Sequence, residues 1–486
     1  MRALKKIAVY LRNQFKLDLR ALALMRICIG LVVLADLIIR SRSIVAHYTD
    51  EGILPIHLLK EFYDNQLYYS FHNLSGSLGC QSTLFILNAI IAIALIFGFK
   101  TRFTTILAWI FMVSLQNRNP FIQQGGDDLF RLVLFFGMFL PWGNFYSLDA
   151  KQKNNFQKKY YFSAATFGYM LLIASVYFFS AMLKTSPEWR SEGTAIYYVL
   201  SLDQLKVGLG DWLYQFPYLM KLLTHFVIFI EFVAPVCIFI PFKNSFFKTL
   251  GAILILILHI GIALNVYVGL FFVIGISSTL GLLPSRFMDW MDTKILKTKS
   301  TISNTFYKSN LKPWLLTLRN IFLTTVIGLC LLMNLGNLNC FQFTIKPQVM
   351  LVSNALKLEQ FWGMFSPNIY KDDGWYIYRG LRLNNSDWDI YNNKESVDHV
   401  KPEHIVKMYE SDRWRKFAEN YQKRNYNFVK PYYCRYLIKK WNKEHPDNKI
   451  DGLYIVFLKE LSLPDYKTAQ IKEENACLCY ENESAK

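Results

Sequence analysis

The sequence lacks the cysteine spacing of a metal site. Its eight cysteines are scattered over 486 residues without the paired short intervals that zinc or iron–sulfur ligands need. Cys28, Cys237 and Cys330 fall inside apolar runs, where a cysteine serves as a small apolar residue. Near the tail, Cys477 and Cys479 indicate a structural pair or unpaired thiols rather than a redox centre. We therefore expect no bound metal, and disulfides only outside the cytoplasm, with a pairing that the sequence leaves open.

A cleavable leader is not expected either. Lys16 and Arg20 precede the first apolar run, which is long and has no small-residue cleavage pattern after it. This run should remain as a membrane span. The chain also has no internal repeat and no long disordered linker, although residues 293–312 form a connector rich in lysine and serine.

The excess of positive charge does not indicate nucleic-acid binding. The chain has 54 Lys and Arg against 36 Asp and Glu, a net charge of +18. Residues 340–486 hold 23 basic and 20 acidic side chains, so +15 of the net charge belongs to the apolar part of the chain. A nucleic-acid-binding protein would carry this excess in its soluble part. We expect no nucleic-acid partner and attribute the charge to membrane topology.

Apolar side chains are abundant. Hydrophobic residues make up 53% and aromatic residues 16% of the chain, and the mean hydropathy of +0.18 is too high for an ordinary soluble domain. The apolar runs cover residues 20–39, 83–99, 103–116, 128–143, 161–183, 219–241, 249–268, 269–284 and 315–336. The longer runs reach the length of about 20 residues that crosses a bilayer, and the shorter ones indicate tilted or shielded helices. We expect an all-α, multi-pass membrane helical bundle with about nine spans.

Basic residues beside the spans predict the orientation, because they tend to stay on the cytoplasmic side. The N-terminal segment is basic, and so is every second connector after it. Nine crossings from a cytoplasmic N-terminus place on the outer face the loops 40–82, 117–127 and 185–218 and all residues after about 337. The prediction is an integral protein of a bacterial inner membrane, with its C-terminal domain periplasmic or otherwise extracytoplasmic.

Two domains are expected. Residues 1–338 should form the transmembrane domain, and residues 339–486 a small extracytoplasmic α+β domain. Its expected elements are a hairpin of Gly374 to Leu383 with Trp388 to Ile390, a helical stretch at about 401–442, and a returning strand from Leu453 to Leu458.

A lysine ends one of the long apolar runs. The run 161–183 is followed by Lys184, after which Ser186 and Pro187 stop the helix and Trp189 is expected at the lipid boundary. The chemistry of an amine in this place depends on how well the neighbouring helices exclude water. Lys184 is therefore either an anchor whose head group reaches water or a catalytic base.

Other ionisable residues fall in or beside the predicted spans, namely Arg26, Asp36, Asp127, Arg131, Glu231 and His259. Charges in lipid are costly unless they are paired, so each residue is either a structural pair or part of a site. Arg26 and Asp36 lie roughly 80° apart around one helix, and each is expected to pair with another helix. Asp127, Arg131, Glu231 and His259 stay open between the two roles.

A series of short motifs resembles one membrane family in content and order. The motifs are Leu22 to Gly30 with Asp36, Tyr48-Thr49-Asp50-Glu51-Gly52, Arg118-Asn119-Pro120 with Gly125-Gly126-Asp127, Tyr146-Ser147-Leu148-Asp149, the Lys184 segment, Glu231-x-x-Ala234-Pro235, His259 with Gly269-Leu270-Phe271, and Trp362-x-Met364-Phe365. Over about residues 18–370 the chain resembles the HTTM domain, the membrane module shared with vitamin K-dependent gamma-carboxylases.

The resemblance implies a specific chemistry. In the gamma-carboxylases, a lysine matching Lys184 deprotonates a reduced naphthoquinone of the vitamin K or menaquinone type. The oxygenated quinone takes the gamma proton of a peptide glutamate, carbon dioxide adds to the carbanion, and the quinone leaves as an epoxide in a lyase-class carboxylation. Such a site needs a neutral amine and an apolar pocket that opens to lipid. This chain departs from the family where Gly126 and Asp127 replace a histidine, and its outer region is much shorter.

Two functional hypotheses follow. The first is an integral-membrane enzyme of gamma-carboxylase type, surrounded by membrane lipid and acting on a peptide or protein substrate at the outer face. The second is a non-enzymatic assembly or export partner of another protein, favoured by the missing histidine and the compact outer domain. A transporter is a weaker third hypothesis, because the sequence shows neither duplicated halves nor paired broken helices. The acceptor and the oligomeric state stay open.

Overall fold

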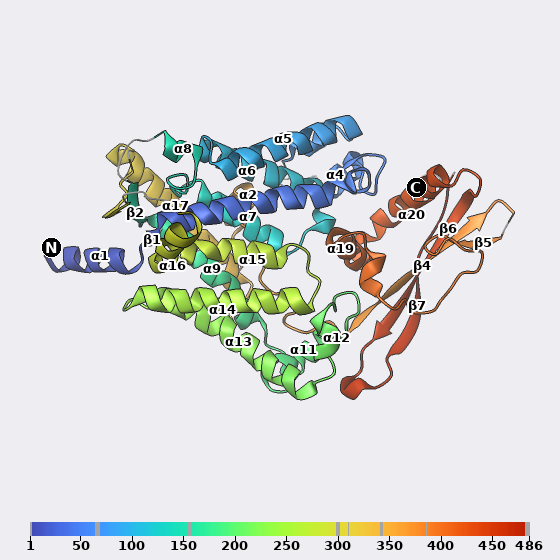
Figure 1. The fold of residues 1–486 in the computed structure, drawn as a ribbon. Coiled ribbons are helices and arrows are strands. Elements are labelled where there is room, and N and C mark those ends of the chain that lie inside the picture. The colour runs from blue at the N-terminus through green and yellow to red at the C-terminus, as the bar shows by residue number, and fades with distance from the viewer. Residues whose placement is uncertain are drawn as a thin grey trace.

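The computed structural model describes residues 2–63, 69–152, 157–297, 302–309, 311–340, 344–384 and 386–481. These residues form a bundle of helices that carries a sheet domain at one end, while the N-terminal helix projects from the other end (Figure 1). The expected fold class, a helical bundle followed by a small α+β part, is the architecture that the described residues adopt.

Six described helices are long and apolar enough to cross a membrane. They are α2 (Leu19–Ser41), α5 (Leu78–Phe97), α9 (Ala164–Leu183), α13 (Pro217–Phe239), α14 (Asn244–Asn265) and α17 (Pro313–Gly336). A further candidate is the pair Phe271–Leu282 and Ser285–Ile295, which bends by 94° and brings the number to seven if it counts as one span. This pair consists of α15 (Phe271–Thr279), η3 (Leu280–Leu282), α16 (Ser285–Trp290) and η4 (Met291–Ile295).

The expected count of nine also needs the runs at 103–116 and 128–143, and these form α6 (Thr101–Arg118) and α7 (Gly125–Gly137). With 13 residues, α7 is about 20 Å long, shorter than the hydrocarbon core. The number of spans therefore stays a prediction.

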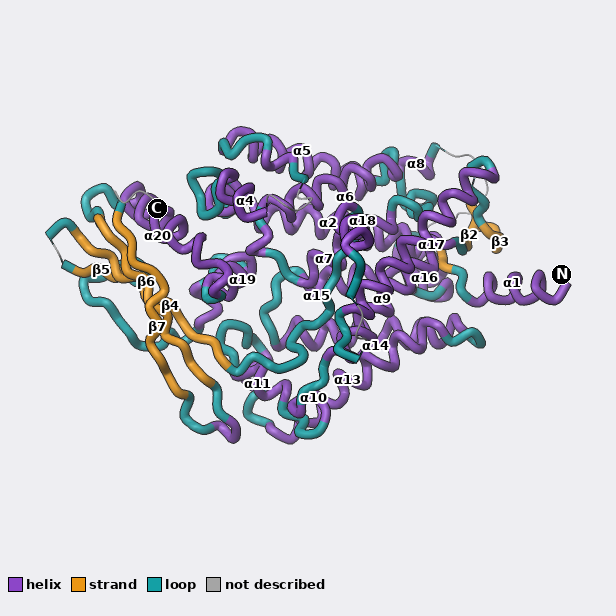
Figure 2. The backbone as a smooth tube through the Cα atoms, turned by 180° about the vertical axis from the view of Figure 1, so that it is seen from behind, coloured by secondary structure: helices purple, strands orange, loops and turns teal. Residues whose placement is uncertain are grey.

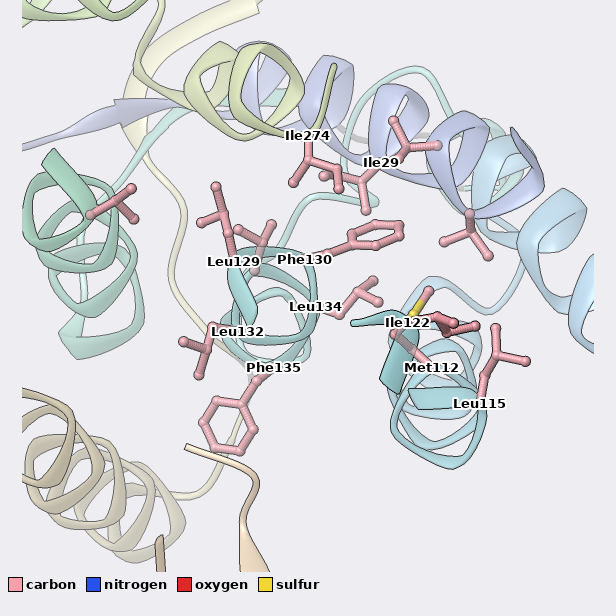
Figure 3. Packing of buried hydrophobic residues seen from close by; sticks show 14 of the residues in the cluster. Ile29, Met112, Leu115, Ile122, Leu129, Phe130, Leu132, Leu134, Phe135 and Ile274 are labelled. Carbon is pink, nitrogen blue, oxygen red and sulfur yellow. The ribbon is translucent and has the colours of Figure 1, made fainter. Parts of the chain in front are cut away.

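Helix α7 is a central helix of the bundle. Its apolar side chains project in several directions, toward α2, α6 and α15 (Figure 3). The residues labelled there are Leu129, Phe130, Leu132, Leu134 and Phe135 of α7, with Ile29, Met112, Leu115, Ile122 and Ile274 around it. A helix that is apolar on all sides is stable only when other elements surround it, which explains why so short a helix is found here.

Short elements connect the long helices. Besides α1 (Arg2–Gln14), they are α3 (Ile44–Tyr48), α4 (Ile56–Tyr63), η1 (Phe71–Asn73), η2 (Pro120–Ile122), α8 (Leu148–Lys151), α10 (Pro187–Arg190), α11 (Ala195–Ser201), α12 (Leu209–Leu213) and α18 (Pro347–Ala355). A small sheet near the N-terminal end has the order β1-β2-β3, with strands Leu17–Asp18, Gln157–Tyr161 and Ile302–Phe306. The sequence did not predict this sheet, because its strands are short and far apart in the chain.

The C-terminal domain is a four-stranded antiparallel sheet covered by helices (Figure 2). Its strand order is β5-β4-β6-β7, with strands Asp387–Asp389, Asp372–Arg382, Ile450–Leu461 and Gln470–Tyr480. The predicted hairpin and returning strand are confirmed as β4, β5 and β6. The charged strand β7 was not predicted.

The predicted helical stretch at 401–442 is not one continuous helix. It is divided into η5 (Ile405–Met408), α19 (Asp412–Tyr421), η6 (Arg424–Val429) and α20 (Lys430–Glu444), and η7 (Pro464–Tyr466) follows between β6 and β7. Pro431 lies in the first turn of α20. A proline there has no N–H to donate to a preceding turn, so a helix begins rather than continues at this point.

One disulfide joins the helices of this domain to its sheet. Cys434 of α20 is bonded to Cys479 of β7, 45 residues away. The sequence left the pairing open, and the bond joins Cys479 to α20 rather than to its neighbour Cys477. The crosslink limits the freedom of the unfolded domain, which is the main way in which a disulfide stabilises a fold.

Replacing both bonded cysteines, Cys434→Ser with Cys479→Ser, is expected to lower the free energy of unfolding of this domain by about 2–4 kcal/mol. Thermal unfolding followed by near-ultraviolet circular dichroism measures the change. Cys340→Ser is the matched control, because Cys340 is exposed and unbonded. Equal unfolding temperatures for the double variant and the control would contradict the stabilising role of the bond.

Candidate functional site

Lys184 lies at the C-terminal end of α9, and its amine points into the bundle. Its Nζ atom is 2.8 Å from each carboxylate oxygen of Glu231 on α13 and 2.5 Å from Oγ of Ser180. Ser180 stands one helical turn before Lys184, so both side chains leave the same face of α9. The Ser180 hydroxyl also donates to Glu231 at 3.0 Å. These three residues, named here the lysine–glutamate triad, form a closed polar group between two apolar helices.

Local sequence explains how the triad forms. Pro187 lies in the first turn of α10, so α9 cannot continue through this segment. Lys184 is the C-cap residue of α9. On α13, Pro235 lies inside the helix four residues after Glu231. A proline at this position cannot donate to the Glu231 carbonyl, which loosens the helix beside the carboxylate.

The triad is inside the protein rather than at a boundary. The whole-residue exposed fraction is 3% for Lys184 and 6% for Glu231. An anchor needs its head group in water, so the structure favours an interior role. A carboxylate bonds to the amine, so Lys184 is not surrounded by apolar side chains alone.

Trp189 was expected at the lipid boundary, and the structure corrects this. The residue is 3% exposed, its indole N–H donates to the Phe365 carbonyl at 2.8 Å, and its ring centroid is 5.0 Å from Nζ of Lys184. An indole buried in this way is held by its hydrogen bond and by the cation beside it. Trp189 therefore fixes the segment around Phe365 over the triad.

A cavity of about 780 Å³ lies beside the triad, and Lys184, Trp189 and Glu231 border it. Within the bundle its wall is apolar, with Leu223, Val227, Ile230, Leu258, Ile262 and Phe271. Toward the C-terminal domain the wall becomes charged and includes Arg415, Lys416, Glu419, Lys423 and Lys459. The cavity thus connects an apolar compartment, with two ionisable groups in its wall, to a polar end in the sheet domain.

The sequence motif around Trp362 contributes to this cavity. Phe361, Gly363, Met364 and Phe365 all line it. The motif resembles one found in HTTM proteins, but its residues alone indicate no role. Its position between the bundle and the sheet domain was not visible in the sequence, because it follows from the way the chain folds back after α17.

His259 is close to the triad but not in the cavity wall that the structure describes. Its Nε2 atom is 2.7 Å from the hydroxyl of Tyr177, and its Nδ1 atom has no hydrogen-bond partner among the described residues. Gly275 is required beside the ring, because a Cβ there would be 2.0 Å from Nε2. The neighbours of His259 on α14, Leu258 and Ile262, do line the cavity. His259 therefore supports the cavity from behind.

Asp127 belongs to a different group. Arg413 of α19 donates to both oxygens of Asp127, at 2.5 and 2.8 Å, and to Asp36 at 2.8 Å. Arg40 donates to Asp36 at 2.7 Å and to Asp127 at 3.1 Å. All four side chains are at most 5% exposed. This four-charge cluster has no net charge and joins α2 and α7 to the C-terminal domain.

Arg26 and Arg131 bind backbone carbonyl groups. Arg26 donates to the carbonyls of Trp142, Ile96 and Tyr146 at 3.1, 3.3 and 2.5 Å. It therefore reaches another helix, α5, through Ile96, and the connector between α7 and α8 through Trp142 and Tyr146, and it binds carbonyl groups rather than a carboxylate.

Arg131 holds the segment that follows α18. It donates to the carbonyls of Lys357 and Glu359 at 2.9 and 2.7 Å and to the Gln116 side chain at 2.9 Å. Neither Arg26 nor Arg131 lines the cavity. Of Lys184 and the six other ionisable candidates, the structure brings only Lys184 and Glu231 into direct contact.

Three residues of these groups were missed in the sequence. Ser180 could have been found from its spacing of four residues before Lys184. Arg40 could have been found in the same way from Asp36. Arg413 carried no signal, because it is 286 residues from Asp127 and belongs to another domain.

The comparisons with known proteins give no further information on the site. No family model, no curated protein and no solved structure matches this chain. The described residues contain no group of three or more His, Cys, Asp or Glu side chains placed to hold a metal ion. The resemblance to HTTM proteins therefore stays a prediction based on the motifs quoted above.

The four-charge cluster predicts a large effect of one substitution. Arg413→Met leaves two carboxylates buried with only Arg40, and we expect the free energy of unfolding to fall by about 3–5 kcal/mol. The control is Arg379→Met, since Arg379 pairs with Asp387 at the surface and should contribute less than about 1 kcal/mol. Thermal unfolding in lipid nanodiscs measures both, and a similar small loss for the two variants would contradict the role of the cluster.

The buried carboxyl group of Asp373 should make the stability of the protein depend on pH. The pKa of this carboxyl is raised to about 7, mainly by burial and also by the nearby carboxylates of Asp203 and Glu460, against the lowering effects of the Gln204 amide and the charge of Lys401. Because the folded-state pKa exceeds the unfolded value of about 3.9, the folded protein binds this proton more tightly. The contribution of this proton to the free energy of unfolding is fully present below about pH 4, and it is lost as the pH rises to about 7.

Asp373→Asn should remove this dependence. Between pH 5 and 7 the variant should gain stability over the parent protein by up to about 1.4 kcal/mol per pH unit. Unfolding temperatures measured at half-unit pH steps give the difference. Parallel pH profiles for the two proteins would contradict the assignment to Asp373.

Proposed function

We propose that this chain is an integral-membrane enzyme of the HTTM type in which the lysine–glutamate triad accepts and holds a proton from a lipophilic hydroquinone. The observation that supports this most strongly is the position of the triad. Two ionisable groups lie 2.8 Å apart, both buried, in the wall of a largely apolar cavity. Ionisable groups arranged in this way are uncommon away from functional sites.

The cavity fits a reduced naphthoquinone of the vitamin K or menaquinone type. Its volume of about 780 Å³ lies within the range of small-molecule sites. Val227, Ile230, Leu258 and Ile262 would hold the fused ring by apolar contact, and Lys184 would meet a ring hydroxyl. When bound and supplied with oxygen, such a quinone provides a base strong enough to remove the gamma proton of a glutamate, to which carbon dioxide can then add.

The protein's own part in this chemistry is proton transfer and positioning. Lys184 takes the hydroxyl proton at Nζ when the proton of the resting ion pair lies on Glu231, because only a neutral amine can accept it, and the two short contacts to Glu231 then hold the resulting ammonium. Ser180 keeps both partners in place by bonding to each of them. Trp189 and Phe365 close the cavity over the triad and exclude water from the proton transfer.

The acceptor is a peptide or protein that approaches from the C-terminal domain. The charged end of the cavity lies at α19 and β6, where Arg415, Lys416 and Lys459 line the wall. A polar substrate could reach the triad from this end without crossing the lipid-facing surface of the bundle.

The proposed location is a bacterial inner membrane, with nine spans, a cytoplasmic N-terminus and a periplasmic C-terminal domain. Two independent observations support this orientation. Basic residues alternate between connectors as expected for cytoplasmic loops. The bond between Cys434 and Cys479 is of the kind that forms in oxidising compartments, and it lies in the domain assigned to the outer face.

One observation favours a second candidate, a non-enzymatic assembly or export partner. Asp127 stands where the gamma-carboxylases carry a histidine, and it is fully engaged by Arg40 and Arg413. A carboxylate held in this way joins two domains and leaves no group free for a reaction. In this candidate function, the pair of Lys184 and Glu231 is a structural ion pair.

The test is turnover of a reduced naphthoquinone by the purified protein in nanodiscs, with oxygen and labelled carbon dioxide. Lys184→Met should reduce quinone oxidation by at least about 100-fold, because general base catalysis contributes about that much. The double variant Lys184→Met with Glu231→Leu removes both charges, so it should fold and remain inactive.

A folded Lys184→Met protein that oxidises the hydroquinone at the parent rate would contradict the enzymatic proposal. The assembly candidate predicts instead that a stoichiometric partner copurifies and that the double variant retains full biological function. A protein that purifies alone and turns over quinone would contradict the assembly candidate.

A further inference from the structure

The N-terminal helix α1 has two chemically different faces. At 100° per residue, Ile7, Tyr10 and Leu11 point to one side, while Lys5, Lys6 and Arg12 point to the other. Val9 is the apolar exception on the basic side. The first 17 residues contain five basic side chains and no acidic one. A helix with this pattern is typical of segments that lie in the interface between a membrane and water.

The apolar face of α1 is not covered by the rest of the described protein. The exposed fractions are 54% for Ile7, 47% for Tyr10 and 38% for Leu11. The helix extends beyond the ends of α13 and α14, away from the sheet domain (Figure 1). Its contacts are concentrated near its C-terminal end, where Tyr10 donates to the Pro241 carbonyl and Arg12 lies over the ring of Phe306.

The basic face of α1 has lysine side chains that can bind a negatively charged partner. Lys5 and Lys6 are exposed, and neither forms an ion pair with a described residue. The nearest acidic residue in sequence, Asp18, is bonded to Arg20. A partner with negative charge next to apolar material would match both faces of α1 at once.

The position of α1 identifies such a partner. Only residues 15–18 separate it from α2, the first membrane-crossing helix. Four residues span at most about 14 Å, so α1 is always within reach of the lipid head groups where α2 enters the bilayer. In the structure α1 projects from the end of the bundle (Figure 1), and a turn at this joint would lay it along the membrane surface.

We propose that α1 is an interfacial helix that binds anionic phospholipids, with Ile7 and Leu11 inserted below the head groups and Lys5 and Lys6 on their phosphates. Each basic residue near an anionic surface strengthens binding by about fivefold. The two lysines together should therefore change the binding equilibrium of α1 by about 25-fold. This inference concerns the lipid around the protein and does not depend on the function proposed for the triad.

The test is hydrogen exchange of the α1 amides in the full protein, held in nanodiscs of either phosphatidylglycerol or phosphatidylcholine. Exchange should be slower in the anionic discs. Lys5→Gln with Lys6→Gln should abolish most of this difference. The control is Lys294→Gln with Lys297→Gln, which removes the same charge from another basic connector and should leave the difference unchanged.

A second variant tests the apolar face separately. Ile7→Gln keeps all the basic residues, and it should also lose most of the protection in anionic discs, because insertion needs the apolar side chain. Equal protection in both lipids would show that anionic head groups do not hold α1, and would overturn the proposal. So would unchanged protection in either the lysine or the Ile7 variant.

Discussion

A charge in an apolar interior must be neutralised where it lies, and this requirement organises the whole molecule. Buried charges in a stable fold either bind several carbonyl groups, as Arg26 does, or occur in closed groups of opposite charge, because separating a buried ion from its partner costs several kcal/mol. The described bundle contains two such groups of particular interest. The lysine–glutamate triad joins α9 to α13, and the four-charge cluster joins α2, α7 and α19. The helices and the C-terminal domain are positioned by these contacts as well as by apolar packing.

The two groups differ in what surrounds them. In the four-charge cluster each carboxylate meets two guanidinium groups. It is suited to holding the C-terminal domain against the bundle. The triad borders a cavity of about 780 Å³ on its open side. A group of this kind can exchange a proton with a bound molecule, because the molecule can approach without disrupting the packing of the helices. The proposed function depends on this distinction.

The sequence predicted those features that depend on local patterns. Apolar runs gave the six long helices, and the two short runs at 374–383 and 388–390 gave the hairpin of β4 and β5. The sequence did not predict features that depend on contacts between residues far apart in the chain. Strand β7 carries Lys472, Glu473 and Glu474 and is held in place by its pairing with β6, so its charged sequence gives no strand signal. Likewise, nothing near Asp127 indicates Arg413. Lys184 was identified from its place at the end of a run, but Glu231 is 47 residues away, and the bond between them depends on the packing of α9 against α13.

The most direct test of the central claim is a structure of the protein in lipid with an oxidised naphthoquinone bound. The account predicts that the ring lies among the apolar residues of α13 and α14, with one ring oxygen within hydrogen-bond distance of Nζ of Lys184. A quinone found elsewhere, with the contact between Lys184 and Glu231 unchanged and the cavity filled by lipid or closed, would contradict it.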